Sequence, residues 1–119
     1  ERQLALIARA LASEAGYLVM DEPTANLDYG NQARVLEEIA RLGQEGIGVL
    51  VSTHHPEHAF RIASRVLLLA RGRLVAQGPT GATLTSAALS SLYGRPIEVA
   101  AVTLGDGTSQ RICVPSPGA

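Results

Sequence analysis

Two adjacent carboxylates, Asp21 and Glu22, follow a short apolar run at residues 17–20 and precede Pro23. A continuous apolar run of this length is typical of a buried strand, and Pro23 favours a turn because it lacks an amide donor. Ligands of open parallel α/β sheets collect beyond the carboxyl ends of the strands, where one acid can hold Mg²⁺ and another can orient an attacking water. Asp21 is therefore a candidate metal ligand and Glu22 a candidate catalytic group, although a solvated turn would use the same three residues.

A second polar cluster, Ser52-Thr53-His54, ends the apolar run at residues 47–51. His54 and His58 are four residues apart, which is the spacing of a helical zinc pair. Pro56 breaks the helix that such a pair needs, and no glutamate base follows His54, so we do not expect zinc.

Helices and strands are expected to alternate around these clusters. Apolar spacing predicts a helix over residues 4–15, and Asp28 is a plausible N-cap for a second helix over residues 29–42. Pro56 can open a short third helix that reaches Ala63. This order, with the apolar runs between the helices, predicts a parallel α/β sheet whose first strand is buried on both faces.

The second helix is expected to be amphipathic, with an apolar inner face and paired charges on its outer face. Arg34 and Glu38, and likewise Glu37 and Arg41, are opposite charges four residues apart. The inner face would consist of Ala33, Leu36, Ile39 and Ala40.

The later residues indicate antiparallel strands and one further helix. Residues 66–69 and 74–76 are apolar and flank Arg71-Gly72-Arg73, which indicates a β-hairpin with its glycine at the turn. Residues 78–83 are rich in Gly, Pro and Thr and are expected to form a loop. The remaining expected elements are a helix at residues 86–93 and extended segments at residues 97–104 and 111–114.

The chain of 119 residues carries ten basic and eleven acidic side chains, and every basic residue is arginine. Without a lysine it has no lysine nucleophile and no phosphate-binding loop of the G-x-x-x-x-G-K type. The net charge of −1 gives no basic surface for nucleic acid, and no apolar run approaches the ~20 residues of a spanning helix. Cys113, the single cysteine, is expected to pack as a small apolar residue.

The segment from Asp21 to Asp28, Asp-Glu-Pro-Thr-Ala-Asn-Leu-Asp, is followed by a helix and then by a strand that ends in Ser52-Thr53-His54. This arrangement resembles the second half of an ABC-type ATPase domain. Glu1-Arg2-Gln3-Leu4 is similar to the end of that family's signature motif. The resemblance covers the chain from its first residue to about Gly78.

The resemblance implies an α/β fold: the C-terminal half of a P-loop NTPase (RecA-like) ABC ATPase domain, with a parallel sheet, a β-hairpin edge and a short C-terminal extension. The ATPase part would cover residues 1–83, and the extension would cover residues 84–119. Because the phosphate loop is absent and the pattern begins inside the signature motif, the chain is expected to be part of a longer domain and to be inactive by itself.

The family's functional residues match five positions of this sequence, with ATP and Mg²⁺ as cofactors. The resemblance implies that Asp21 holds Mg²⁺ through water, that Glu22 polarises the attacking water, and that His54 senses the γ-phosphate. Asp28 lies at the D-loop position and would reach a partner subunit. Glu1 would lie near the nucleotide that this partner binds.

Residues 84–99 and 53–59 are similar to ATPases of bacterial importers of iron-siderophores, haem, cobalamin and related metal chelates. That likeness implies a second ATPase subunit, integral membrane permease subunits and a periplasmic or lipoprotein substrate-binding protein as partners, and no nucleic acid. The implied location is peripheral, on the cytoplasmic face of the bacterial inner membrane. The alternatives are a molybdate-type importer, a soluble ABC ATPase without a transport role, and an inactive fragment.

Overall fold

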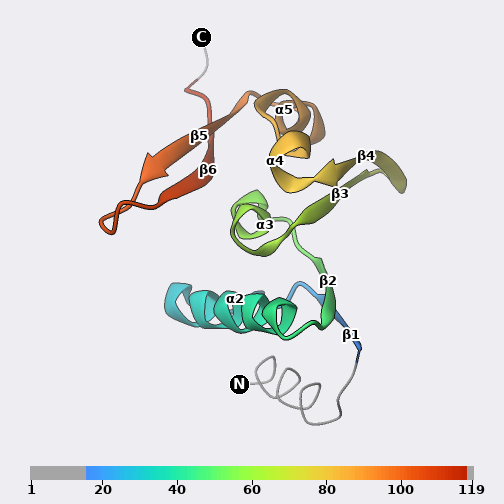
Figure 1. Ribbon diagram of the computed structural model, residues 1–119. Helices are drawn as coiled ribbons and strands as arrows, with labels where there is room; N and C mark the ends of the chain where they lie inside the picture. Colours follow the sequence, from blue (N-terminus) through green and yellow to red (C-terminus); the bar gives the residue numbers. More distant parts are fainter. Residues whose placement is uncertain (1–15, 118–119) are drawn as a thin grey trace. The chain divides into compact units, whose positions relative to one another are not determined.

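The computed structural model describes residues 16–117 (Figure 1). The chain forms two compact units, Glu1–His54 and His55–Ala119, and each is described by itself. The helix expected at residues 4–15 and the candidate residue Glu1 lie outside the described residues. Within the described part of the chain, no helix is long and apolar enough to cross a membrane.

The first unit contains two parallel strands joined by a helix. β1 (Tyr17–Asp21) leads through a turn into α2 (Tyr29–Gln44), and β2 (Gly48–Ser52) follows. The strands pair in a register that runs from Tyr17 opposite Gly48 to Asp21 opposite Ser52. The two predicted strands and their parallel pairing are confirmed, so both carboxyl ends lie at one edge of the pair.

Polar contacts hold the start and the outer face of α2. The Asp28 carboxylate accepts a hydrogen bond of 2.8 Å from the Asn31 amide, which confirms the predicted N-cap. Glu38 pairs with Arg41 at a distance of 3.3 Å. This pair is three residues apart, so it replaces the predicted pairs of residues four apart.

The buried face of α2 differs from the predicted one. Ala33 and Ala40 are only partly buried, although both were expected on the inner face. Larger side chains bury more apolar area, so they take the inner positions in place of the two alanines. The buried residues are Val35, Leu36, Ile39 and Leu42.

The parallel pair is covered on one face only within residues 16–54. Met20 of β1 is 3% exposed, whereas its neighbour Val19 is 72% exposed and Tyr17 is 84% exposed. Leu50 of β2 is also largely exposed, at 59%. The prediction of a first strand buried on both faces is therefore wrong for the described residues, because α2 is the one helix there that packs on the strands.

Two antiparallel hairpins and three short helices make up residues 55–117. β3 pairs with β4 and β5 pairs with β6, so the described strands form three separate two-stranded sheets. The predicted hairpin is present, with a left-handed φ of 74° at Gly72 in its turn. In chain order the elements are α3 (Pro56–Ile62), β3 (Arg65–Ala70), β4 (Arg73–Pro79), α4 (Thr80–Thr83), α5 (Ser86–Tyr93), β5 (Ile97–Thr103) and β6 (Ser109–Pro115).

The loop predicted for residues 78–83 is wrong, because β4 continues to Pro79 and α4 follows at once. Thr80 holds this segment with its amide and its hydroxyl. Its amide donates to Ser64 O at 3.1 Å, and its hydroxyl donates to Ala63 O at 2.6 Å. These contacts outweigh the local preference of a segment rich in Gly, Pro and Thr.

An apolar cluster joins the β3/β4 hairpin to the C-terminal segment. Phe60 of α3 and Cys113 of β6 pack against it, as expected for this cysteine. The described residues from Leu84 to Pro117 therefore share a core with the hairpin. The buried members of the cluster are Leu68, Leu84, Leu89 and Ile97.

Candidate active site

The carboxyl ends of β1 and β2 bring together four polar residues, Asp21, Glu22, Ser52 and His54, which we call the acidic edge. Asp21 ends β1 and lies opposite Ser52, which ends β2. The Ser52 hydroxyl donates a hydrogen bond to Asp21 Oδ1. The Glu22 amide, one residue beyond the strand, donates to Ser52 O at 2.9 Å and to Ser52 Oγ at 3.1 Å.

His54 contacts the carboxylate of Glu22, with 2.9 Å between Nδ1 and Oε1. An ionised carboxylate can only accept, so Nδ1 carries the hydrogen. The Glu22 side chain is 32% exposed, and that of His54 is 70% exposed. The other oxygen, Glu22 Oε2, is buried and has no hydrogen-bond partner among the described residues. A buried acceptor without a donor is unfavourable, so the site favours a ligand or water that donates to this oxygen.

The turn after β1 sets the direction of these side chains. Glu22 and Asn26 have φ angles of 47° and 63°, in the left-handed region that non-glycine residues rarely occupy. Pro23 and Thr24 between them are buried, which anchors the turn. The Ala25 amide closes it with a bond of 3.1 Å to Glu22 O.

Three of the five predicted site residues meet at the acidic edge, namely Asp21, Glu22 and His54. Asp28 lies at the far end of the turn, where it caps α2. Glu1 lies outside the described residues. Ser52 was not among the residues predicted for the site. The one sign of its role in the sequence is that it is a polar residue at the end of the second apolar run. Its contact with Asp21 depends on the register in which the two strands pair.

The carboxylates of the acidic edge are suited to bind a hard cation that also contacts a phosphate ligand. Mg²⁺ is held by one or two carboxylates together with waters and phosphate oxygens, and Asp21 and Glu22 supply carboxylates of that kind. No three His, Cys, Asp or Glu side chains of residues 16–117 form a cluster that could hold a metal on their own. The rings of His55 and His58 lie against each other, with 4.6 Å between their centroids.

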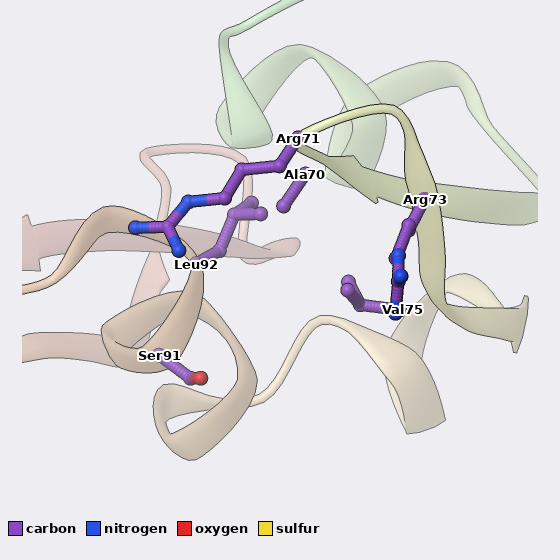
Figure 2. Close-up of a pocket in the computed structure, with 6 residues that line it drawn as sticks. All are labelled: Ala70, Arg71, Arg73, Val75, Ser91 and Leu92. Atoms are coloured by element: carbon purple, nitrogen blue, oxygen red, sulfur yellow. The ribbon is translucent and has the colours of Figure 1, made fainter.

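A pocket of about 480 Å³ lies within the second unit, between the β3/β4 hairpin and α5. Figure 2 shows the side chains of Arg71 and Arg73 on opposite sides of it. No carboxylate or imidazole lines this pocket, so it offers no acid or base for catalysis. Its lining residues are Ala70, Arg71, Arg73, Val75, Ser91 and Leu92.

Known proteins resemble the chain over most of its length. An uncharacterized ABC transporter ATP-binding protein of Haemophilus influenzae is 44% identical over 93 residues, which is 78% of this chain and 35% of that protein. The hemin import ATP-binding protein HmuV of Rhodococcus jostii is 36% identical over 99 residues, which is 83% of this chain and 34% of that protein. Other matching relatives are named for the import of ribose and of phosphate.

A solved structure agrees with these relatives. A metal-chelate type ABC transporter in an inward-facing conformation is 36% identical, with a TM-score of 0.86, and the match covers 97% of this chain and 45% of that chain. No protein-family model matches the chain. The chain spans about a third of the length of the two relatives above, and its fold matches part of the P-loop NTPase domain of ABC ATPases, as predicted. The chain therefore belongs to the family of ABC transporter ATP-binding proteins.

Proposed function

We propose that the protein carrying this chain binds and hydrolyses ATP, with Mg²⁺, as the ATP-binding subunit of a bacterial ABC importer. The observation that carries the proposal is the geometry of the acidic edge. His54 holds one carboxylate oxygen of Glu22 at 2.9 Å, and the other oxygen is buried without a partner among the described residues. Asp21 ends the strand that leads into Glu22.

Asp21 is the residue that would hold the metal, through a water molecule. Its Oδ1 accepts from the Ser52 hydroxyl, so the carboxylate has a defined orientation at the end of β1. When bound, Mg²⁺ neutralises charge on the phosphate oxygens during phosphoryl transfer. This chain contributes one carboxylate, fixed at a position where the metal could bind it through water and bind the phosphate at the same time.

Glu22 is the group that would take a proton from the attacking water, at Oε2. Phosphoryl transfer depends on positioning and charge stabilisation, so a fixed acceptor is what this step needs from the protein. His54 supplies the fixation through its Nδ1–H bond to Oε1. In its imidazolium form, which also carries a hydrogen on Nε2, the same side chain would donate to the γ-phosphate and so relate the nucleotide to the position of Glu22.

The proposal extends to partners. A second ATPase subunit would complete the site, with Asp28 reaching across to it and Glu1 near its nucleotide. Permease subunits and a periplasmic or lipoprotein substrate-binding protein would form the rest of the importer, and this protein would be peripheral on the cytoplasmic face of the inner membrane.

We assign metal chelates, such as iron-siderophores or haem, as the transported class. The structural relative of metal-chelate type, with a TM-score of 0.86, and the relative named for hemin import support this assignment. Relatives named for the import of ribose and of phosphate also match this chain. Importers of different substrates therefore have similar sequences in this part of the ATP-binding subunit.

ATP hydrolysis by the complete protein that contains this chain, assembled with its permease in lipid vesicles, tests the proposal. Glu22→Gln keeps the size of the side chain but removes the base, so phosphate release should fall by about 10²–10⁴-fold. His54→Ala removes the group that orients Glu22 and should also lower the rate.

Glu37→Gln on the exposed face of α2 and His58→Ala on α3 are matched controls, and both should keep the parent rate. Parent-like hydrolysis in Glu22→Gln would contradict the assignment of the catalytic glutamate. A complete, assembled protein that releases no phosphate from ATP would contradict the proposed function itself.

A further inference from the structure

The mechanism above uses Ser52 only through its bond to Asp21, yet Ser52 contacts both acids of the edge. Its hydroxyl donates to Asp21 Oδ1 and accepts from the Glu22 amide at 3.1 Å. Its carbonyl accepts from the same amide at 2.9 Å. One residue therefore binds the carboxylate proposed to hold the metal and the backbone of the proposed base.

The two bonds of the hydroxyl act together. A serine hydroxyl has one hydrogen, and accepting from the Glu22 amide leaves that hydrogen for Asp21 Oδ1. Asp21 Oδ1 is thereby held by the protein. Among the described residues no hydrogen bond reaches Asp21 Oδ2, which is the oxygen left for a metal-bound water.

The segment from Ser52 to His54 also controls both ends of Glu22. Ser52 binds its amide, and two residues later His54 binds its carboxylate at 2.9 Å. The φ of 47° at Glu22 is a backbone conformation that needs support from its surroundings. The bonds from Ser52 give that support at the point where the strand ends.

We propose that Ser52 is a positioning residue, whose hydroxyl holds Asp21 in the orientation that binds Mg²⁺ through water and keeps the Glu22 turn aligned with it. This inference rests on the proposed function, because it needs Asp21 to hold the metal. Ser52 acts through these two residues and is not itself a metal ligand.

Metal binding without turnover is the first test. The complete protein is mixed with a non-hydrolysable ATP analogue and titrated with Mn²⁺, whose free concentration is read by electron paramagnetic resonance. Ser52→Ala removes the donor and the acceptor and should raise the Mn²⁺ dissociation constant by about 10–100-fold, as loss of a residue that orients a metal ligand does. Ser52→Thr keeps the hydroxyl and suits a strand, so it should bind Mn²⁺ like the parent. Ser52→Cys, a weak donor of similar size, should behave like Ser52→Ala and replaces it if the alanine variant does not fold.

Steady-state kinetics give a second readout that a general structural defect would not reproduce. In Ser52→Ala the Mg²⁺ concentration for half-maximal hydrolysis should rise, whereas the KM for ATP at saturating Mg²⁺ should stay at the parent value. Ser109→Ala, at the exposed start of β6, is the control and should change neither quantity.

Unchanged Mn²⁺ binding in Ser52→Ala, or an equal loss in Ser52→Thr, would overturn the proposal. The two proposals fail separately. If Glu22→Gln abolishes hydrolysis but the Ser52 variants bind Mn²⁺ like the parent, the role of Ser52 is wrong and the proposed function stands. If the parent hydrolyses no ATP while Mn²⁺ binding follows the expected order, the proposed function is wrong and Ser52 still positions a metal-binding acid.

Discussion

Glu22 is held at its amide by Ser52 and at its carboxylate by His54, so a residue with a φ of 47° keeps a defined side-chain position. A left-handed backbone costs a non-glycine residue about 1–2 kcal/mol. Each hydrogen bond contributes about 0.5–1.5 kcal/mol, so the contacts of Glu22 are of the size needed to offset that cost. The position of the proposed base thus depends on its neighbours rather than on its own conformational preference.

Cys113 is a second residue whose chemistry depends on its neighbours. Its sulfur lies 3.7 Å from Glu57 Oε1, and it packs against the apolar cluster of the second unit. Burial raises the pKa of the Cys113 thiol above its usual value, and the negative charge of Glu57 and its hydrogen bond raise it further. At a given pH the reactive thiolate is therefore scarcer than in a free cysteine.

Removing the charge of Glu57 should make Cys113 react faster. In Glu57→Gln the pKa of the thiol falls, because the like charge that opposed the thiolate is gone, so alkylation at a fixed pH speeds up and its pH profile shifts downward. The rate of iodoacetamide labelling at Cys113 against pH measures this. Glu98→Gln lies on the neighbouring strand β5, where its side chain points to the other sheet face, and should leave the rate unchanged. Equal rates in both variants would show that Glu57 does not control the thiol.

Acids at the end of an apolar run indicated Asp21 and Glu22 as candidates, and the resemblance to ABC ATPases added His54. The residue types could not predict the part that Ser52 plays. Its bond to Asp21 depends on the register in which two strands 31 residues apart pair. That register joins two segments far apart in the chain and is not a property of any single residue.

At the scale of elements, most helices and strands lie where their patterns predicted. The cap of α2 at Asp28 was predictable because it depends on residues three apart. The helix α4 was not, since its support comes from Thr80 bonding to Ala63 and Ser64, which lie elsewhere in the chain. Composition therefore predicted a loop where tertiary contacts form a helix.

Gly78, next to the last residue of β4, has a conformation that other residues avoid, with a φ of 150°, and an added Cβ would lie 2.9 Å from Thr83 Oγ1. Gly78→Ala should therefore lower the free energy of unfolding by about 1–3 kcal/mol. Urea denaturation of the complete protein measures the change.

Gly43→Ala in α2 is the matched control, because an added Cβ would meet no atom within 4 Å beyond its chain neighbours and the backbone of its own helix. That change should be neutral or should stabilise the protein by up to about 1 kcal/mol, since alanine favours helix. A Gly78→Ala variant as stable as the Gly43→Ala variant would show that the turn into α4 relaxes freely.

At the scale of the whole molecule, the order of elements predicted one parallel sheet with a hairpin edge. The described residues contain both the parallel pair and the hairpin, in separate sheets. Alternation of helices and strands indicates which elements form, but the hydrogen-bond partners of an edge strand lie far away in the sequence. For the same reason the apolar pattern of β1 could not show which of its faces would be covered.

The transported substrate is a property of the assembled importer. In vesicles that hold the permease and the substrate-binding protein, we expect ATP hydrolysis and uptake to rise when the binding protein is loaded with hemin or a ferric siderophore. Loading with ribose or phosphate should have no effect. Stimulation by ribose or phosphate alone would contradict the metal-chelate assignment and leave the ATPase function intact.

Within residues 16–54, the exposed face of β1 and β2 favours self-association. Tyr17, Val19 and Leu50 form an exposed apolar surface, and a two-stranded sheet has unpaired backbone groups that can take up a strand from another molecule. In a concentrated sample of the chain alone, such stacking would compete with folding. Light scattering would then detect aggregates of the chain before an enzyme assay could detect ATP hydrolysis. A soluble preparation would first require that this face be covered.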